Sequence, residues 1–302
     1  MKSKTIILNA LLLISILCNS LFTFSQNDTV LNKKRFFLFS GITATTYIGT
    51  MLILNELWYK NYSHSSFHFF DDSQEWLQMD KAGHVFSSYY LSSILIKGFN
   101  WSKMNHNKSV ILGTGVSFVA MMSIEVFDGF SSKWGASWTD AAANISGNLL
   151  YAGQELLWKK QICRLKFSYH PTDWTHYRPD ALGKTDLQSV LKDYNGQTYW
   201  LSCNMRSISG IKKIPGWLNI AFGYGGKAML GGKNNFESTY NFEPPFPVRY
   251  RQYYFSLDAD LTRIKVKSKL LRSIFKAVNC LKIPFPALVL EQKHFGVKSV
   301  YF

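Results

Sequence analysis

The stretch DKAGHVFSSYYLSSILIK, residues 80–97, holds 15 uncharged residues between Lys81 and Lys97. Three more uncharged runs occur in the first half of the chain, at residues 36–55, 109–124 and 141–154. A membrane core of ~30 Å requires about 20 helical residues to cross it, and the run at 36–55 has that length. The sequence therefore predicts four apolar helices that form a membrane or membrane-associated bundle.

The charges between these runs are sorted by side. If the four helices alternate in direction, the basic connections (residues 33–35, 97–108 and 159–166) lie at one end of the bundle. The opposite end receives most of the acidic residues of this half, namely Glu56, Asp71, Asp72, Glu75, Asp80, Glu125, Asp128 and Asp140. Such sorting of charge is typical of a helical bundle that spans a membrane and is not expected of a protein surrounded by water.

The N-terminus has the pattern of a secretory signal peptide. Lys2 and Lys4 precede an uncharged segment, and the small residue Ser25 offers a cleavage site, so a signal peptide is predicted over residues 1–25. Cys18 follows Leu17, where a lipid-attachment motif requires a small residue, so lipidation is not expected. A cleaved signal would place the basic loops outside, against the positive-inside rule. Either the segment is not simply a cleaved signal, or the bundle is not an ordinary inner-membrane one.

The second half is basic and polar. Residues from Arg164 onward carry 21 Lys/Arg against 9 Asp/Glu, yet without an arginine-rich helix or a zinc-finger spacing, so a nucleic-acid partner is not predicted. Attraction to an anionic membrane surface is the favoured interpretation of this charge, and a solvated basic face is the alternative. The odd number of cysteines after the signal (Cys163, Cys203 and Cys280) favours free thiols, with one pair possible.

Alternating apolar residues predict about four strands in this half. They lie at residues 199–205, 218–224, 255–262 and, more weakly, 295–302, and helical spacing appears at 269–281 and over a short segment at 189–194. The predicted fold class is thus mainly α: a four-helix apolar bundle over residues 26–163, followed by a small mixed α+β domain over residues 164–302. The hydrophobic fraction of 47% and the low charged fraction of 18% exclude a disordered chain.

Polar residues at the ends of three of these helices form the candidate site. Asp80, Lys81 and His84 open the second helix, and Glu125 and Asp128 close the third. The fourth opens with further polar and small residues, Ser137, Asp140, Asn144 and Gly147. Since neighbouring helices alternate in direction, all three groups are expected in one layer, where two helix N-termini favour an anion. Ionisable groups in an apolar bundle are functional candidates.

Each group also has a purely structural interpretation. Ser137 and Asp140 fit a capping box, Asp80 suits the first turn of a helix, and Glu125 precedes the helix-stopping Gly129. His64 and His68 lie four residues apart but lack a second ligand cluster, so neither a metal nor a cofactor is predicted. The chain lacks the short motifs of serine hydrolases, zinc proteases and nucleotide-binding proteins.

The pattern formed by these groups resembles a known family. Asp-Lys-x-x-His at a helix start, a Glu at the end of the next helix and Ser-x-x-Asp-x-x-x-Asn-x-x-Gly on a third are similar to the YfiM-like predicted periplasmic lipoproteins, a domain of unknown function. They resemble the VanZ-like membrane proteins more distantly. The resemblance covers about residues 76–158 and implies an exported protein of the cell envelope, either on the periplasmic side or associated with a membrane.

These observations lead to a functional expectation with two alternatives. We expect a non-enzymatic envelope protein that binds a lipid, glycolipid or cell-wall-precursor headgroup at the acidic end of the bundle. The first alternative is a hydrolase or acyl-transfer enzyme that uses His84 as a base, although Ser87, Ser88 and Ser137 are the only nearby candidate nucleophiles. The second is a structural scaffold, in which the polar groups merely hold the helices together.

Overall fold

A computed structural model describes residues 30–60, 62–235 and 247–302 of the chain. The contacts within it define two units. Unit 1 comprises the described residues up to Asp71 together with Ser87–Lys159, and unit 2 comprises Asp72–Phe86 together with Lys160–Phe302. The signal peptide predicted over residues 1–25, with Cys18, lies outside the described residues. The domain limits predicted from the sequence stay predictions.

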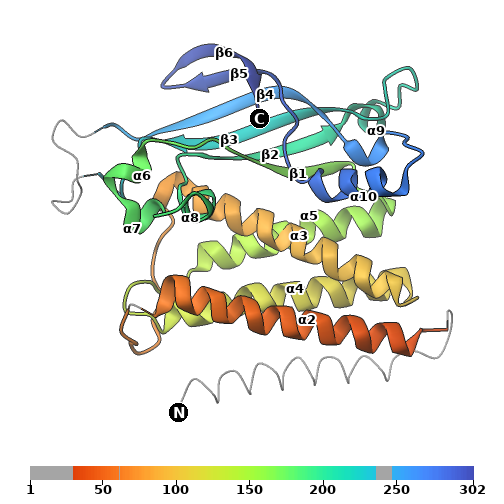
Figure 1. The fold of residues 1–302 in the computed structure, drawn as a ribbon, viewed down its shortest axis with the longest axis horizontal. Coiled ribbons are helices and arrows are strands. Elements are labelled where there is room, and N and C mark those ends of the chain that lie inside the picture. The colour runs from red at the N-terminus through yellow and green to blue at the C-terminus, as the bar shows by residue number, and fades with distance from the viewer. Residues whose placement is uncertain (1–29, 61, 236–246) are drawn as a thin grey trace. The chain divides into compact units, whose positions relative to one another are not determined.

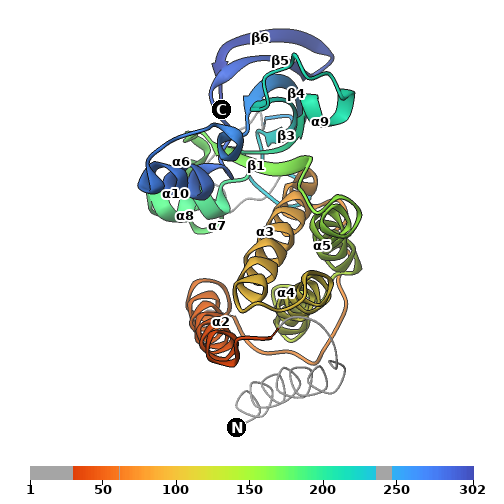
Figure 2. The same cartoon turned by 90° about the vertical axis from the view of Figure 1, so that its right-hand side faces the viewer.

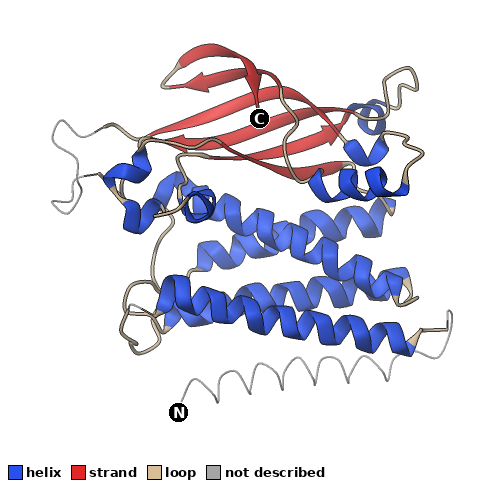
Figure 3. Cartoon of the chain, viewed as in Figure 1, coloured by secondary structure: helices blue, strands red, loops and turns tan. Residues whose placement is uncertain are grey.

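All four predicted apolar helices are present (Figure 1). They are α2 (Lys33–Leu54), which continues into the π-helical turn η2 (Asn55–Tyr59), α3 (Met79–Trp101), α4 (His106–Gly129) and α5 (Trp138–Trp158). Polar side chains fix three of the four starts, because Asn32, Asn105 and Ser137 accept hydrogen bonds from backbone N–H groups in the first turns of α2, α4 and α5. Figure 3 draws these helices in blue.

Hydrogen bonds within unit 1 show that α2, α3 and α4 alternate in direction. The backbone N–H of Asn32, before α2, donates to the carbonyl of Ser102, after α3, over 2.9 Å. At the other end of α2, the hydroxyl of Tyr59 donates to Asp128, near the end of α4, over 2.7 Å. The basic connections before α2 and between α3 and α4 therefore lie at the same end of unit 1, as the charge pattern predicts.

Two of the described helices, α2 and α4, are long and apolar enough to cross a membrane. The outer side of α2 carries exposed apolar side chains, among them Phe37, Leu52 and Ile53. Length and composition therefore allow a crossing for these two helices, and the predicted membrane insertion of the bundle stays a prediction.

The interior of unit 1 contains a line of buried polar groups. The amide oxygen of Asn148 in α5 accepts hydrogen bonds from the hydroxyl of Ser92 in α3, over 2.7 Å, and from that of Ser117 in α4, over 2.8 Å. These three buried side chains join the three helices. Close packing accompanies them, because a Cβ at Gly113 of α4 would lie 2.7 Å from the backbone nitrogen of Ile96 in α3.

Unit 2 is built on one six-stranded antiparallel sheet, in which each strand pairs with the next along the chain. The strands are β1 (Cys163–Tyr169), β2 (Gln197–Asn204), β3 (Leu218–Lys227), β4 (Tyr250–Ala259), β5 (Phe285–Glu291) and β6 (His294–Tyr301). The four predicted strands are confirmed as β2, β3, β4 and β6, and the structure adds β1 and β5. The prediction of about four strands was therefore too low.

Short helices precede α3 or connect the strands. They are η3 (Glu75–Gln78) before α3, then α6 (Trp174–Tyr177), α7 (Pro179–Leu182), α8 (Asp186–Lys192), α9 (Met205–Ser209), η4 (Leu261–Arg263) and α10 (Lys269–Val278). α10 confirms the helix predicted at 269–281, and α8 overlaps the short helix predicted at 189–194 but begins three residues earlier.

The sheet is strongly curved, as Figure 2 shows for the upper part of the chain. The curvature brings the residues before β5 beside β1, where the N–H of Phe167 donates to the carbonyl of Cys280 and the N–H of Lys282 donates to the carbonyl of Phe167. The concave side holds a core of Trp200, Tyr254 and Tyr301, together with small side chains of the same strands. Unit 2 thus resembles a small, partly closed barrel with a filled interior.

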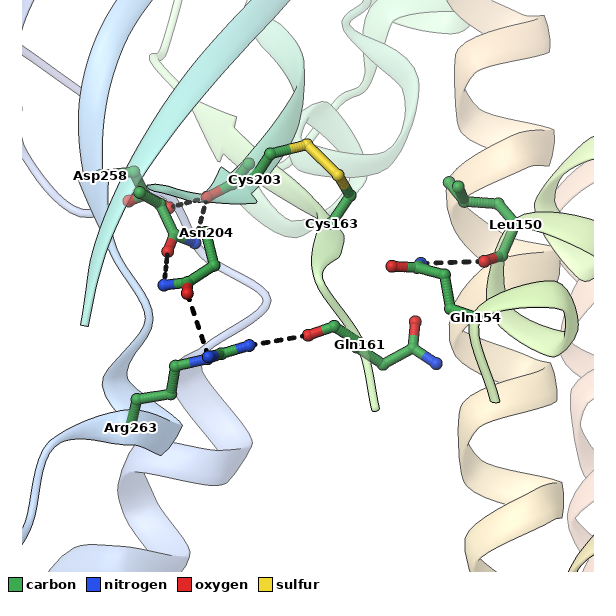
Figure 4. The surroundings of a disulfide bond; sticks show 10 residues. Leu150, Gln154, Gln161, Cys163, Cys203, Asn204, Asp258 and Arg263 are labelled. Carbon is green, nitrogen blue, oxygen red and sulfur yellow. Dashed lines mark hydrogen bonds between the residues drawn. A yellow bond between two sulfur atoms is a disulfide. The ribbon is translucent and has the colours of Figure 1, made fainter. Parts of the chain in front are cut away.

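A disulfide joins Cys163 and Cys203, which face each other across β1 and β2 (Figure 4). Beside it, the guanidinium of Arg263 donates to the side-chain oxygen of Asn204 and to the carbonyl of Gln161. The expectation of free thiols was therefore wrong for this pair, and Cys280 is the free cysteine of the described residues. A disulfide fits an oxidising compartment such as the periplasm.

The sheet buries several polar side chains beside its apolar core and exposes several large apolar ones. In β4, Ser256 and Asp258 point into the core, whereas Phe255 and Leu257 are 42% and 41% exposed. The alternation in β4 predicted a half-buried strand, which by itself favours burial of the apolar set. The strand is present, but its faces are reversed.

Candidate functional site

A left-handed turn positions the start of α3 in unit 2. Trp76, Leu77 and Gln78 all have positive φ angles, between 47° and 63°. Such a backbone costs of order 1–3 kcal/mol for each residue and persists only where surrounding contacts hold it. Here the N–H of Trp76 donates to the carbonyl of Gly232 over 2.7 Å, and the guanidinium of Arg251 donates to Gln78 over 2.7 Å. The sheet thus fixes the direction in which α3 begins.

Asp80, Lys81 and His84 form the first cluster, at the first turns of α3. The Nζ atom of Lys81 lies 2.6 Å from Oδ2 of Asp72 and 3.2 Å from Oδ2 of Asp80. Nε2 of His84 lies 3.8 Å from Oδ1 of Asp80, and that oxygen accepts a hydrogen bond of 3.0 Å from the hydroxyl of Tyr194. All four ionisable side chains are largely buried, so the charges of Lys81, Asp72 and Asp80 interact more strongly than at the surface.

Glu75 adds a further carboxyl group just before this cluster. Burial raises its pKa; the nearby Lys233 opposes that shift, and the charge of Asp72 adds to it. Its carboxylate lies against Gly232, where a Cβ would come within 2.9 Å of Oε2. Several acidic groups therefore share a small region of unit 2 with one lysine and one histidine of α3.

Glu125, Ser137 and Asp140 form the second cluster, in unit 1, where α4 ends and α5 begins. The side chains of Glu125 and Asp140 are almost fully buried, with 2% and 5% of each residue exposed. Oε2 of Glu125 accepts a hydrogen bond of 3.3 Å from the backbone N–H of Ser137. The hydroxyl of Ser137 in turn accepts one of 3.1 Å from the N–H of Asp140, so the predicted capping interaction is present.

The remaining predicted residues extend this second cluster. Asn144 and Gly147 are both buried and follow Asp140 along α5. Asp128 accepts the hydrogen bond of Tyr59, and burial raises the pKa of that phenol, with the charge of Asp128 raising it further. The Tyr59 hydroxyl therefore stays a hydrogen-bond donor over the physiological range.

The structure brings the predicted residues together within each unit. Asp80, Lys81 and His84 meet in unit 2, and Glu125, Ser137 and Asp140 meet in unit 1. The expectation that the two clusters share one layer stays a prediction. Sequence reasoning missed Tyr59 and Tyr194, whose partners lie 69 and 114 residues away and for which no local pattern gives a signal.

One family model matches the chain. Residues 68–152 match the family described as "Predicted periplasmic lipoprotein (DUF2279)", which confirms the resemblance drawn from the three helix-end groups. The matched segment contains every residue of both predicted clusters. The match covers less than a third of the chain, its description is consistent with an exported protein of the cell envelope, and it does not support the VanZ-like part of the resemblance. No curated protein and no solved structure matches the chain.

Proposed function

We propose that the chain is a non-enzymatic envelope protein whose helical bundle binds the headgroup of a lipid, glycolipid or cell-wall precursor. The observation that carries this proposal is the burial of Glu125 and Asp140 in a unit made of apolar helices. Burying a carboxylate costs free energy that packing alone does not recover. Ionisable groups in such surroundings are therefore functional candidates.

The donor set fits a headgroup that carries both a phosphate and polar groups that donate hydrogen bonds. Lys81 and the N–H groups at the starts of α3 and α5 would favour the phosphate. Carboxylates such as Asp80, Glu125 and Asp140 would accept hydrogen bonds from sugar hydroxyls or an ammonium group. Asp128, Ser137, Asn144 and Gly147 would shape the same end of the bundle.

Lipid binding to the purified full-length chain in mild detergent tests the proposal. Native mass spectrometry would measure retained envelope phospholipids and glycolipids for the wild type, His84→Gln and Asp140→Asn. His106→Gln is the matched control, since His106 lies at the opposite end of unit 1, beside Glu155. We expect the first two variants to lose the bound lipid and the control to keep it. Equal retention in all variants contradicts the proposal.

The same variants separate the two alternatives. Turnover of extracted envelope lipids by the wild type, lost in His84→Gln, would replace binding by the enzymatic alternative. Loss of the helical circular-dichroism signal or of the folded state in His84→Gln would instead favour the scaffold. Retained helicity combined with lost lipid, without turnover, supports the binding function.

A further inference from the structure

The outward side of the sheet in unit 2 is apolar across four strands. Phe222, Phe255, Leu288 and Val297 are direct partners in successive strands and form one continuous row. Each of the four is exposed, between 42% and 70%. With Leu257 in the next row, these side chains make up what we call the outer face.

The inward side of the same strands carries polar and charged groups beside the apolar core that includes Trp200 and Val289. Asp258 is fully buried and pairs with the equally buried Lys166, whose Nζ lies 2.7 Å from Oδ2 of Asp258. Ser202 donates to the same carboxylate over 2.6 Å. An antiparallel sheet in water places its apolar side on the core and its polar side outward. Here the inward side is mixed and the outward side is apolar, and an apolar outward side is the pattern of strands that face lipid.

One end of the sheet is strongly cationic and amphipathic. α10 joins the end of β4 to the start of β5, and its apolar residues Leu270 and Ile274 are exposed rather than packed on the sheet. Its other side carries Lys269, Arg272 and Lys276. The sequence has no acidic residue between positions 261 and 290. A helix with these two sides is typical of segments that lie at a membrane interface.

We propose that the outer face lies on an anionic lipid surface, with its apolar side chains among the acyl chains and α10 at the level of the headgroups. The positive charge of α10 complements anionic lipids, which selects a membrane over a second copy of this equally basic chain. This surface is separate from the proposed headgroup site of the bundle.

The dimensions of the face indicate contact with one leaflet rather than a crossing. The outward residues of β4 from Tyr253 to Leu257 span four steps of about 3.3 Å, or about 13 Å. A strand that crosses a membrane needs an apolar band about 25 Å tall. The face is therefore tall enough to enter one leaflet and too short to span two.

Site-specific quenching tests this contact in the full-length chain. A fluorophore is attached to Leu288→Cys in a background where Cys18 and Cys280 are serine, and the protein is reconstituted into vesicles that contain lipids brominated on the acyl chains. Leu187→Cys is the matched control, because Leu187 is an exposed leucine of α8, away from the outer face. We expect quenching at position 288 in vesicles containing phosphatidylglycerol and none at position 187.

Charge removal provides the second arm. Replacing Lys267, Lys269, Arg272 and Lys276 by Gln, all at exposed positions, should abolish the quenching at position 288 in anionic vesicles, as should 1 M salt. Three results would overturn the proposal: no quenching at position 288, equal quenching at both positions, or a doubled molar mass in light scattering together with an unquenched label at position 288. The last result would assign the outer face to a second copy.

Discussion

Replacing Asp258 by Asn tests the charge balance inside the sheet of unit 2. The side chains of Asp258, Lys166 and Lys282 are fully buried, with Nζ of Lys166 2.7 Å and Nζ of Lys282 3.9 Å from the carboxylate. Lys282 also donates to the carbonyls of Leu257 and Ile283. Two lysines thus share one carboxylate in a site without water contact.

The expected loss of stability follows from this count of charges. Asn keeps the shape of Asp258 but removes its negative charge, which takes from both buried lysines the carboxylate that they share. Breaking a buried ion pair in this way costs about 3–5 kcal/mol of unfolding free energy. We expect the unfolding free energy to fall by that amount at pH 7, while the fold stays unchanged in the absence of denaturant.

The pH dependence has a definite sign. Burial lowers the pKa of Lys282 to about 8, and Asp258 opposes this shift. Between pH 8 and the ordinary lysine pKa of 10.5, Lys282 is protonated in the unfolded chain and neutral in the folded chain. This group therefore makes the unfolding free energy rise by about 1.4 kcal/mol per pH unit over that range. In Asp258→Asn the pKa of Lys282 falls further, so this rise begins at lower pH and the deficit shrinks as pH increases.

Urea unfolding of the full-length chain in mild detergent measures both effects. Cys280 has a half-buried thiol in unit 2, so its alkylation reports the unfolding of this unit. Peptide mass spectrometry measures the alkylation rate, which is normalised to the rate of the fully unfolded chain at each pH. Asp180→Asn is the control, because Asp180 and Lys184 form an exposed pair whose loss should leave the midpoint unchanged. A deficit below about 1 kcal/mol for Asp258→Asn, or one that grows from pH 7 to 9.5, refutes the reasoning.

Three further predictions concern packing, covalent and polar contacts. Gly113→Ala should lower the stability of unit 1 by about 1–3 kcal/mol, because the new methyl group meets the backbone of α3. Gly115→Ala in the same helix has open space around the new methyl group and should raise the stability by about 0.5–1 kcal/mol. Thermal melts followed by circular dichroism at 222 nm compare the two variants. Reducing the disulfide between Cys163 and Cys203 should cost unit 2 about 4 kcal/mol, given their separation of 40 residues, and a shift in the urea midpoint with and without reductant measures it. Asn148→Leu should cost about 1–3 kcal/mol, because the buried hydroxyl of Ser92 loses its acceptor and that of Ser117 keeps only the carbonyl of Ser88; the melting temperature measures this loss.

The helices of unit 1 could be predicted because their signal is local. An uncharged run as long as residues 36–55 indicates a helix without information from the rest of the chain. The capping residue Ser137 lies directly before its helix, so it too can be recognised locally. The residues of each cluster could also be chosen from the sequence, since carboxylates near the ends of apolar helices stand out. Their partners Tyr59 and Tyr194 could not, because only the folded chain brings them to Asp128 and Asp80.

The strands that were missed show the limits of alternation as a signal. β5 contains Pro286, which argues against a strand when only the sequence is known. β1 alternates Leu165 and Phe167 with Lys166, a pattern that is ambiguous in so short a segment. Alternation also reveals that a strand has two unlike faces without stating which one meets the core. That choice depends on what surrounds the sheet, and the sequence does not contain it.

Both units expose large apolar side chains and bury polar ones beside their apolar cores, and this shared feature links the two proposals. In unit 1 the apolar Phe37 is exposed on α2, while the polar Asn148 and the carboxylate of Glu125 are buried among the helices. In unit 2 the apolar Phe255 is exposed and Asp258 is buried. Water alone penalises both choices, because apolar surface gains by leaving it and carboxylates lose by leaving it. An apolar environment removes the first penalty, and ion pairs, hydrogen bonds or a bound headgroup reduce the second. A chain with an average composition can therefore suit a lipid surface through the arrangement of its side chains, without an excess of apolar residues.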